Sequence, residues 1–434
     1  MKVLVLGSGG REHALVWRIS QSPLVSRMFC APGNPGIGRL AELVPLKTTD
    51  LEALADFATR EQIGLTVVGP EQPLADGIVD LFLSRGLTVF GPTRRAAELE
   101  WSKSFAKDFM KRNNIPTAGY ATFTSDRLED ARGYLQRCPI PVVLKADGLA
   151  AGKGVVICPS RDEALSALTA MIESRIFGTA GNTVVVEEFL EGEEASVFAV
   201  CDGKDFLTLA PAQDHKRAFD DDRGKNTGGM GAYAPAPLVT GEILEEVEQR
   251  IIRPTLDGMA REGRPYAGCL YVGLMMTVSG PKVVEFNARF GDPETQVVLP
   301  LYDGDFAALL LASSRGTMGM HVHRQPSSAT HAHAVCVVLA SGGYPDTYRT
   351  GLPIEGLESL DNREGIIAFH AGTRSEGKRI LTAGGRVLGV TAMAQGPLER
   401  AIAAAYGAVE KVSFEGMHYR RDIGKKGLRS ARKG

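Results

Sequence analysis

The sequence predicts a multidomain chain of α/β and α+β type, with an N-terminal parallel α/β domain and a small mixed C-terminal domain. Short apolar strands alternate with helical patterns through residue 95, and this alternation is typical of a parallel sheet. A second block from residue 102 onward places strands on both sides of a glycine-rich loop. The length of 434 residues also exceeds what one ordinary core supports.

Three short apolar runs, at residues 2–6, 65–68 and 87–90, are predicted strands of the N-terminal domain. The first turns through four residues of GSGG into a helical pattern at residues 11–20. The other two each end at a Gly-Pro pair. Ligand contacts are expected beyond the carboxyl ends of such strands.

The middle of the chain begins with a predicted helix at residues 102–114, which Pro116 prevents from continuing. We predict further strands at residues 141–145, 155–158, 183–189, 195–201, 271–278 and 282–287, and a helix near 161–174. The polar, glycine-rich segment 215–231 is predicted to be a functional loop, not a packed element. A strand at 334–339 opens the last unit, and a basic tail without apolar periodicity ends the chain.

The composition is that of a soluble globular enzyme, with 44% hydrophobic and 23% charged residues. Forty-nine basic and fifty-one acidic residues leave a formal charge of −2, which offers no field for nucleic acid or a membrane surface. No signal-peptide pattern and no apolar run of about 20 residues is found. We therefore expect a cytoplasmic protein, with its six scattered cysteines as reduced core thiols.

The first motif is GSGGREH at residues 7–13, which only partly matches a dinucleotide fingerprint. That fingerprint needs glycine at its sixth position, where this chain has Glu12, and an acidic residue after the second strand. The backbone N–H groups of a glycine-rich helix N-terminus still favour an anion, and Arg11 is adjacent. A phosphate monoester would suit this turn, although a βα turn without a ligand is the alternative.

The second motif combines Lys145, at a predicted strand end, with the glycine-rich loop 147–154. Gly152 lets backbone amides approach phosphate oxygens, and Lys153 and Lys145 supply positive charge. The spacing is not that of a Walker motif. A surface hairpin with solvated lysines explains either lysine alone but not the whole string.

The third motif is the acidic turn at residues 186–194, which follows a predicted strand. It could offer backbone groups to adenine and a carboxylate to ribose hydroxyls. By itself, a solvated acidic face is the better interpretation.

The fourth motif lies at residues 283–294, where alternation places Glu285, Asn287 and Arg289 on one face of a strand and Val284 and Phe286 on the other. A carboxylate and an amide oxygen two residues apart can bind one hard cation that bridges nucleotide phosphates. Arg289 could stabilise the oxyanion of a transferring phosphoryl group. An ordinary half-exposed strand explains the alternation but not the crowded sequence GDPE that follows.

Taken in order, these motifs resemble the ATP-grasp architecture over about residues 100–325. The strings GSGGREHAL, KADGLAAGKGV, EEFLEGEEAS, HKRAFDDDRGKNTGGMGAY and EFNARFGDPETQ resemble the glycinamide ribonucleotide synthetase family from end to end. The resemblance implies domains at residues 1–100, 101–190, 191–325 and 326–423, followed by a flexible basic tail at 424–434. The first is the domain that precedes the ATP-grasp pair.

The family's reaction implies the substrates and cofactors. ATP phosphorylates glycine, and the amine of 5-phosphoribosylamine attacks the glycyl phosphate to give glycinamide ribonucleotide for purine biosynthesis, with magnesium or manganese as the metal. Catalysis would rest on positioning and charge neutralisation. From the balanced charge we expect no nucleic-acid or membrane partner, and we expect a monomer or weak dimer.

The resemblance also assigns roles to single residues. Phosphate contacts fall on Lys103 and Lys145, the adenine contacts on Glu187, Glu188 and Leu190, and the ribose contact on Glu193. The metal ligands are Glu285 and Asn287, and the groups that handle glycine, the sugar amine and the acyl phosphate are Asp214, Lys216 and Arg289. The sugar phosphate should face Gly9, Gly10, Arg11 and Asn34.

Some features leave alternatives open. Many ATP-grasp relatives carry an acidic metal ligand where this chain has Gly273-Leu274-Met275-Met276, so the shell of a second cation is not assigned. Two His-x-His pairs (His321/His323 and His331/His333) are interpreted as solvated, and His215 is a candidate proton acceptor. The competing functions are another ATP-grasp ligase or carboxylase, a nicotinamide-dependent oxidoreductase, and a nucleotide sensor without catalysis.

Overall fold

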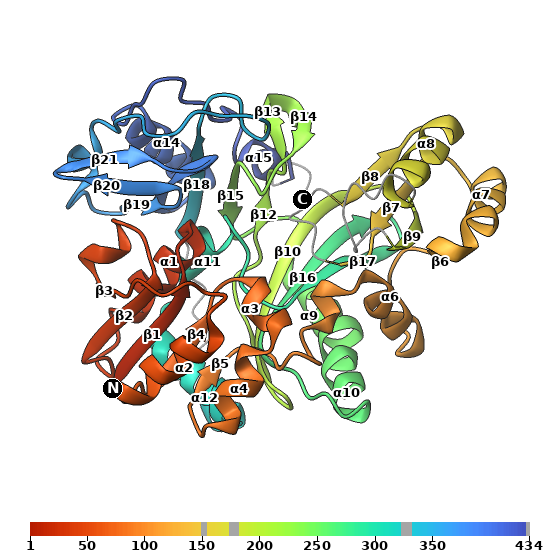
Figure 1. The fold of residues 1–434 in the computed structure, drawn as a ribbon. Helices are drawn as coiled ribbons and strands as arrows, with labels where there is room; N and C mark the ends of the chain where they lie inside the picture. Colours follow the sequence, from red (N-terminus) through yellow and green to blue (C-terminus); the bar gives the residue numbers. More distant parts are fainter. Residues whose placement is uncertain (149–153, 173–181, 323–331, 431–434) are drawn as a thin grey trace.

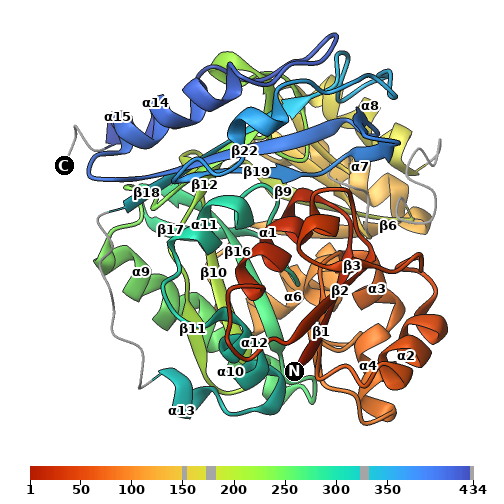
Figure 2. The ribbon, with the colours of Figure 1, turned by 90° about the vertical axis from the view of Figure 1, so that its left-hand side faces the viewer.

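The computed structural model describes residues 1–148, 154–172, 182–322 and 332–430. The N-terminal part (red and orange) and the C-terminal part (blue) lie on one side of the molecule, and a small sheet of the middle part projects on the opposite side (Figure 1). Figure 2 shows the long C-terminal strands lying across the N-terminal part. The predicted combination of α/β and α+β domains is confirmed.

The N-terminal sheet is fully parallel, with strand order β3-β2-β1-β4-β5. Its strands are β1 (Lys2–Gly7), β2 (Arg27–Pro32), β3 (Glu42–Leu43), β4 (Leu65–Val68) and β5 (Val89–Phe90). Its helices are α1 (Gly10–Ile19), α2 (Leu51–Arg60), α3 (Glu71–Asp76) and α4 (Ile78–Ser84). Both faces of β1 are buried, as its unbroken apolar sequence predicts. The turns after β1 and β4 therefore meet at one sheet edge.

The projecting sheet is antiparallel, with order β6-β9-β7-β8. Its strands are β6 (Tyr120–Thr124), β7 (Val142–Ala146), β8 (Val155–Cys158) and β9 (Thr183–Glu188), and α7 (Leu128–Arg137) and α8 (Arg161–Ile172) pack on it. The preceding helices are α5 (Glu98–Trp101) and α6 (Lys103–Arg112). Ser102 begins α6 because its hydroxyl accepts from the amide of Phe105 at 3.1 Å.

The second central sheet is also antiparallel, with order β11-β10-β16-β17. Its strands are β10 (Glu193–Asp202), β11 (Phe206–Thr208), β16 (Ala267–Thr277) and β17 (Gly280–Asn287). The helices of this region are α9 (Gly241–Val247), α10 (Arg253–Arg261), α11 (Thr295–Leu301), α12 (Phe306–Arg315) and α13 (Met318–Val322). The amide of Val283 in β17 donates to the carbonyl of Pro116 at 2.8 Å, which ties this sheet to the projecting one.

The C-terminal sheet takes strands from two distant parts of the chain, in the order β12-β15-β18-β22-β19. β12 (Gln213–Asp214) and β15 (Gly231–Ala234) come from the middle, and β18 (Ala332–Ala340), β19 (Ile366–His370) and β22 (Arg386–Gln395) come from the end. A hairpin of β20 (Thr373–Glu376) and β21 (Arg379–Thr382) follows β19, and α14 (Leu398–Val409) packs on β18 and β22. The middle and the end of the chain thus share one sheet.

Two local predictions need correction. The segment 215–231 is not an unstructured loop, because β13 (Arg217–Phe219) and β14 (Arg223–Asn226) pair within it as a hairpin. The predicted tail is ordered through α15 (Lys425–Ser430). There Gly427 is buried, and a Cβ at its position would lie 2.7 Å from atoms of Leu398 and Tyr233. Close packing against two apolar side chains holds a segment that composition alone marks as frayed.

The six cysteines are unpaired and buried, which confirms their prediction as core thiols. Among the residues that the structure describes, no single helix is long and apolar enough to cross a membrane. The bent pair α11 and α12 passes the same test by length and composition alone.

Candidate active site

A buried charge triad joins the projecting sheet to α6. The Glu187 carboxylate on β9 forms ion pairs with Lys145 Nζ on β7 at 3.0 Å and with Lys107 Nζ on α6 at 2.8 Å. All three side chains are almost fully buried. Burial lowers the pKa of Lys107 to about 8, although the nearby Glu187 opposes that shift. The structure therefore brings the predicted residues Lys145 and Glu187 into direct contact.

Replacing Glu187 by Gln should destabilise the chain, because two buried ammonium groups lose their shared carboxylate. We expect the free energy of unfolding to fall by about 3 kcal/mol, as for other broken buried pairs. Urea denaturation of the full chain measures this loss. The matched control is Glu188→Gln, whose exposed side chain accepts from the amide of Gly119 at 3.1 Å. Equal unfolding midpoints for the two variants would contradict a stabilising triad.

The start of the glycine-rich loop is fixed to the N-terminus of α6. The Asp147 carboxylate accepts from the amide and hydroxyl of Ser104, at 3.1 and 2.7 Å. Lys103 Nζ donates to the carbonyl of Gly148 at 2.8 Å, and burial lowers the pKa of this lysine. Lys103 thus contacts the start of the loop, which follows Lys145 along the chain. Gly152 and Lys153, which were predicted to contact phosphates, lie outside the described residues.

The predicted adenine and ribose contacts follow one another at the end of β9. Glu188 is exposed, Leu190 is buried, and Glu193 is exposed at the start of β10. Between them Gly192 has a φ of +158°, and a Cβ there would lie 2.2 Å from the carbonyl oxygen of Met276. The chain can turn so close to β16 only with glycine at this position. The turn thus links the exposed carboxylate of Glu188, at the end of β9, to that of Glu193, at the start of β10.

Glu285 lies at the centre of the predicted site. Burial by itself would raise the pKa of this carboxyl group. The cations of Lys216, Lys145, Lys103 and Arg289 outweigh that effect and hold the pKa below its usual value. Glu285 is therefore an anion at neutral pH, and the four cations that stabilise it are all predicted site residues.

The alternation predicted for this strand is interrupted by a bulge. Gly273 pairs with Glu285 while Leu274 pairs with Val283, so Val284 has no opposite residue. Val283 and Phe286 are consequently both buried, and Val284 does not share a face with Phe286 as predicted. The free carbonyl of Val284 accepts from Lys145 Nζ at 3.0 Å. The bulge thus connects the strand of Glu285 to the phosphate-side lysine.

Arg289 connects this strand to the N-terminal part. Its guanidinium lies 3.2 Å from Glu100 Oε1 and 3.3 Å from Glu71 Oε2, and it donates to Asn287 Oδ1 at 3.4 Å. Burial raises the pKa of Glu100, although Arg289 opposes the shift. The predicted pair of Asn287 and Arg289 therefore contact each other, and Arg289 is held by two carboxylates.

Asp214 and Lys216 form the third part of the site. Burial raises the pKa of Asp214 to about 7; Lys216 opposes this shift, whereas Glu294 and Glu194 add to it. Lys216 Nζ lies 2.5 Å from Glu194 Oε2. Burial would lower the pKa of Lys216, but Glu194 and Asp214 raise it well above its usual value. Near neutral pH, Asp214 is thus present in both its protonated and its ionised form, whereas Lys216 stays charged.

The structure does not support His215 as a proton acceptor. Its ring is fully buried, and burial together with the charge of Arg420 lowers its pKa to about 3. Neither ring nitrogen has a hydrogen-bond partner. Alternation along the chain places this ring opposite Asp214 and Lys216. Of the His-x-His residues, His323 and His331 lie outside the described residues, and His333 Nδ1 lies 2.9 Å from the carbonyl of Gly396.

The turn after β1 already holds an internal anion. Glu12 bends back to the helix start, where its carboxylate accepts from the amide of Gly9 at 2.6 Å and from Arg11 Nε at 2.6 Å. A Cβ at Gly7 would lie 2.5 Å from Glu12, so glycine is needed there. The Gly9 amide and Arg11, both predicted to face a sugar phosphate, are therefore engaged by Glu12.

Gly10 and Asn34 contact the C-terminal part of the chain. A Cβ at Gly10 would lie 3.7 Å from Cβ of Ala371 in the C-terminal part, and 2.6 Å from Gln296 Nε2 on α11. The Asn34 side-chain amide donates to the carbonyls of Ser8 and His370, each at 2.8 Å, and its oxygen accepts from Ile37 at 3.0 Å. Asn34 thus braces the turn against β19.

The donor set around Glu285 partly fits a hard cation. Glu285 is anionic, and the Asn287 oxygen has only a long bond to Arg289, so both can supply oxygen ligands. Within the described ranges, no cluster of three or more His, Cys, Asp or Glu side chains could hold a metal by itself. The remaining ligands would have to come from phosphate oxygens or water.

Three family profiles cover most of the chain. They are described as phosphoribosylglycinamide synthetase N domain (residues 1–100), ATP-grasp (A) domain (101–295) and C domain (334–426). The chain belongs to the phosphoribosylglycinamide synthetase family. It is therefore an ATP-grasp ligase in fold and family, as the resemblance of its motifs implied.

Individual relatives agree with this family over their full lengths. Phosphoribosylamine–glycine ligase of Chlorobaculum tepidum is 54% identical, covering 99% of this chain and 100% of the relative. The Escherichia coli protein of the same name is 49% identical, with 98% of each chain covered. The crystal structure of the Thermotoga maritima ligase is 36% identical, with a TM-score of 0.83 and 98% and 100% coverage. A biotin carboxylase domain of Hydrogenobacter thermophilus, at 19% identity and a TM-score of 0.72 over 96% and 91% of the chains, shares the fold.

In this family member, sequence reasoning missed three side chains at the site. Lys107 lies on α6, where no motif marks it, and Glu294 lies within the fourth motif but was given no role. Arg386 comes from β22, and its guanidinium lies 3.0 Å from Asp292 Oδ2 and 2.9 Å from the Asp292 carbonyl. Its bond to the carbonyl of Gly228 joins the C-terminal part to the site. Only the close approach of distant segments reveals Arg386.

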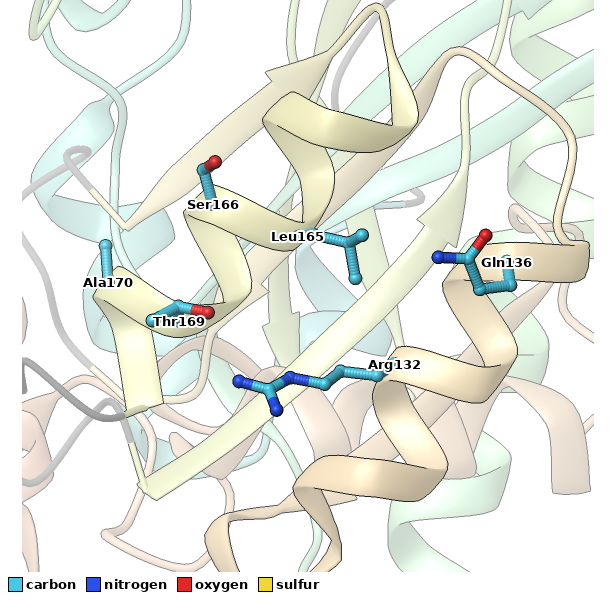
Figure 3. A pocket seen from close by; sticks show the side chains of 6 residues that line it. All are labelled: Arg132, Gln136, Leu165, Ser166, Thr169 and Ala170. Carbon is cyan, nitrogen blue, oxygen red and sulfur yellow. The ribbon is translucent and has the colours of Figure 1, made fainter.

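A shallow groove between α7 and α8 is separate from this site (Figure 3). Side chains of both helices line it: Arg132, Gln136, Leu165, Ser166, Thr169 and Ala170. None of these is a predicted site residue of the synthetase.

Proposed function

We propose that the chain joins glycine to 5-phosphoribosylamine while ATP is converted to ADP and phosphate. The family and the shared name of its relatives support this activity. The observation that carries the proposal is the convergence of Lys103, Lys145, Lys216 and Arg289, whose positive charges together hold the pKa of Glu285 below its usual value. Such a site suits phosphoryl transfer, which depends on positioning and on neutralising charge.

The reaction has two steps. An oxygen of the glycine carboxylate attacks the γ-phosphorus of ATP, and the bond from that phosphorus to ADP breaks. The amine of 5-phosphoribosylamine then attacks the acyl carbon of glycyl phosphate, the carbon–oxygen bond to phosphate breaks, and the nitrogen loses a proton. The product is glycinamide ribonucleotide, an intermediate of purine biosynthesis.

The nucleotide would bind between the projecting sheet (β6-β9-β7-β8) and the sheet of β11, β10, β16 and β17. Lys103, Lys145 and the loop with Gly152 and Lys153 would contact its phosphates. The other contacts would come from the end of β9: adenine with Glu187, Glu188 and Leu190, and ribose with Glu193. Because Lys107 also holds Glu187, the triad would fix the adenine and phosphate contacts relative to each other.

Glu285 and Asn287 would hold the divalent cation, magnesium by preference and manganese as a substitute. The cation would neutralise phosphate oxygens of the nucleotide. Lys216 and Arg289 would neutralise the acyl phosphate. Asp214, whose pKa of about 7 lies near the working pH, would accept the proton of the attacking amine.

The sugar phosphate would face the turn with Gly9, Gly10 and Arg11, with Asn34 bracing that turn. We also propose domain boundaries at residues 100, 190, 325 and 423. The proposed location is cytoplasmic, and the proposed oligomeric state is a monomer or weak dimer.

The test is ADP formation with magnesium-ATP, glycine and freshly generated 5-phosphoribosylamine, with each component omitted in turn. We expect ADP only in the complete mixture, together with glycinamide ribonucleotide in equal amount. ADP that forms without the sugar amine would indicate a different acceptor, such as that of another ATP-grasp ligase. Tight NAD binding without ADP formation would indicate an oxidoreductase instead.

A further inference from the structure

The β13–β14 hairpin, next to the proposed reaction centre, is held by the C-terminal segment 418–426. Figure 1 shows α15 beside this hairpin, although about 200 residues separate them in the chain. The hairpin begins directly after Lys216. Its attachment therefore bears on where the Lys216 ammonium lies.

Arg420 makes the central contacts of this attachment. Its side chain has no exposed surface. Nε and NH2 donate to the two carboxylate oxygens of Asp422 at 2.8 and 2.7 Å, and NH1 donates to Asp222 Oδ1 at 2.9 Å. NH1 also donates to the carbonyl of Arg217 at 3.1 Å. One planar guanidinium thus donates to two carboxylates and one backbone carbonyl.

Neighbouring residues extend the contact along the hairpin. The amide of Arg421 donates to Asp220 Oδ1 at 2.7 Å, and the amide of Asp221 donates to Asp422 Oδ2 at 2.9 Å. Lys426 Nζ lies 2.6 Å from Asp222 Oδ2. Asp221 and Asp222 have backbone φ values of 56° and 51°, in the left-handed region that is uncommon for residues other than glycine. The hairpin turn is therefore shaped by the C-terminal segment.

The contact reaches Lys216 through the backbone. Arg217, whose carbonyl accepts from Arg420, is the next residue after Lys216. The Lys216 carbonyl itself accepts from the amide and the hydroxyl of Thr227, at 2.7 and 2.9 Å. The two sides of the hairpin are thus fixed at the point where Lys216 leaves it toward Glu194.

We infer that Arg420 is a positioning residue, which holds the hairpin so that Lys216 faces the glycyl phosphate. Buried ion pairs contribute little net stability compared with apolar packing, because both charges lose water. Their geometric demand is strict, since a guanidinium bonds its partners only in one plane. The inference rests on the proposed function, because it assigns the effect to the groups that handle glycine and the sugar amine.

The experiment compares Arg420→Lys with the wild-type chain. Lysine keeps the charge but cannot bond Asp422, Asp222 and the Arg217 carbonyl together. We expect the KM for glycine or for 5-phosphoribosylamine to rise at least fivefold, with the KM for ATP changed less than twofold. The nucleotide contacts lie on other elements, so a displaced hairpin leaves them in place.

The matched control is Arg421→Lys. Arg421 is the next residue, its side chain is exposed, and only its backbone bonds to the hairpin. All three KM values should match those of the wild type. A merely structural role for Arg420 would lower the active fraction and thus kcat, with no KM changed, and this result would overturn the inference.

A second variant keeps the test decisive if Arg420→Lys does not fold. Asp222→Asn retains the Arg420–Asp422 pair, and asparagine tolerates the positive φ. We expect a smaller rise in the same KM values; none in either variant would overturn the inference. A wild-type chain inactive in the complete mixture would instead refute the proposed function.

Discussion

Glu285→Gln should lower turnover at least tenfold while the fold is kept. The change removes one anionic oxygen from the proposed cation site, so the metal binds more weakly and neutralises less phosphate charge. The four cations around Glu285 keep other partners, among them Glu187 for Lys145, Glu194 for Lys216 and Glu100 for Arg289. We therefore expect the variant to fold.

Steady-state rates at increasing magnesium concentration test this prediction. The half-saturating magnesium concentration should rise together with the loss of kcat. Glu415→Gln is the control, because that carboxylate pairs with Arg349 on the surface, and its kinetics should equal those of the wild type. Turnover near the wild-type value in Glu285→Gln would remove Glu285 from the metal site.

Asp214→Asn should lower kcat/KM for 5-phosphoribosylamine about 100-fold, a typical loss for a positioned proton acceptor. The wild-type profile should rise with pH through about 7, because burial holds the pKa of Asp214 near that value and only the anion accepts a proton. The variant should lack this rise. A variant profile with the same limb would assign the titration to another group.

The same substitution should stabilise the chain at neutral and higher pH. The folded-state pKa of Asp214, about 7, lies above the ordinary aspartate value of 3.8, so the folded chain favours the protonated form. The contribution of Asp214 to stability is then fully present below about pH 4 and is lost as the pH rises through 7. Asparagine stays neutral, so its melting temperature should exceed that of the wild type at pH 8, and the excess should shrink toward pH 4. The opposite sign would show that Asp214 is stabilised as an anion.

Local patterns were sufficient for much of the fold. The apolar run at 65–68 became β4 without change, and β8 matches the predicted 155–158. β4 is recognisable because both of its faces are buried, so nearly every side chain is apolar. The charged residues at Lys145, Glu187 and Glu285 were found by motif, and the structure places them within one network.

Features that depend on distant segments could not be predicted. The bulge at Val284 arises from pairing with β16, and pattern alone gives an unbroken alternation. In the sequence, Glu12 shows only that the sixth glycine of the dinucleotide fingerprint is absent. Its contact with the Gly9 amide depends on how the helix begins. Arg420 and Arg386 lie in the C-terminal part, and the sequence around them does not point to partners 198 and 158 positions earlier. The order of the last helix likewise depends on packing against Tyr233.

The sheet shared by the middle and the end of the chain determines when the protein can complete its fold during synthesis. β15 pairs with β12 on one side and with β18 on the other, and β18 follows it by about a hundred residues. Until the ribosome has released β18, β15 presents an unpaired edge to other chains. A fragment ending near residue 325 keeps that edge permanently. We expect such a fragment to aggregate, and the last hundred residues to be an integral part of the catalytic body.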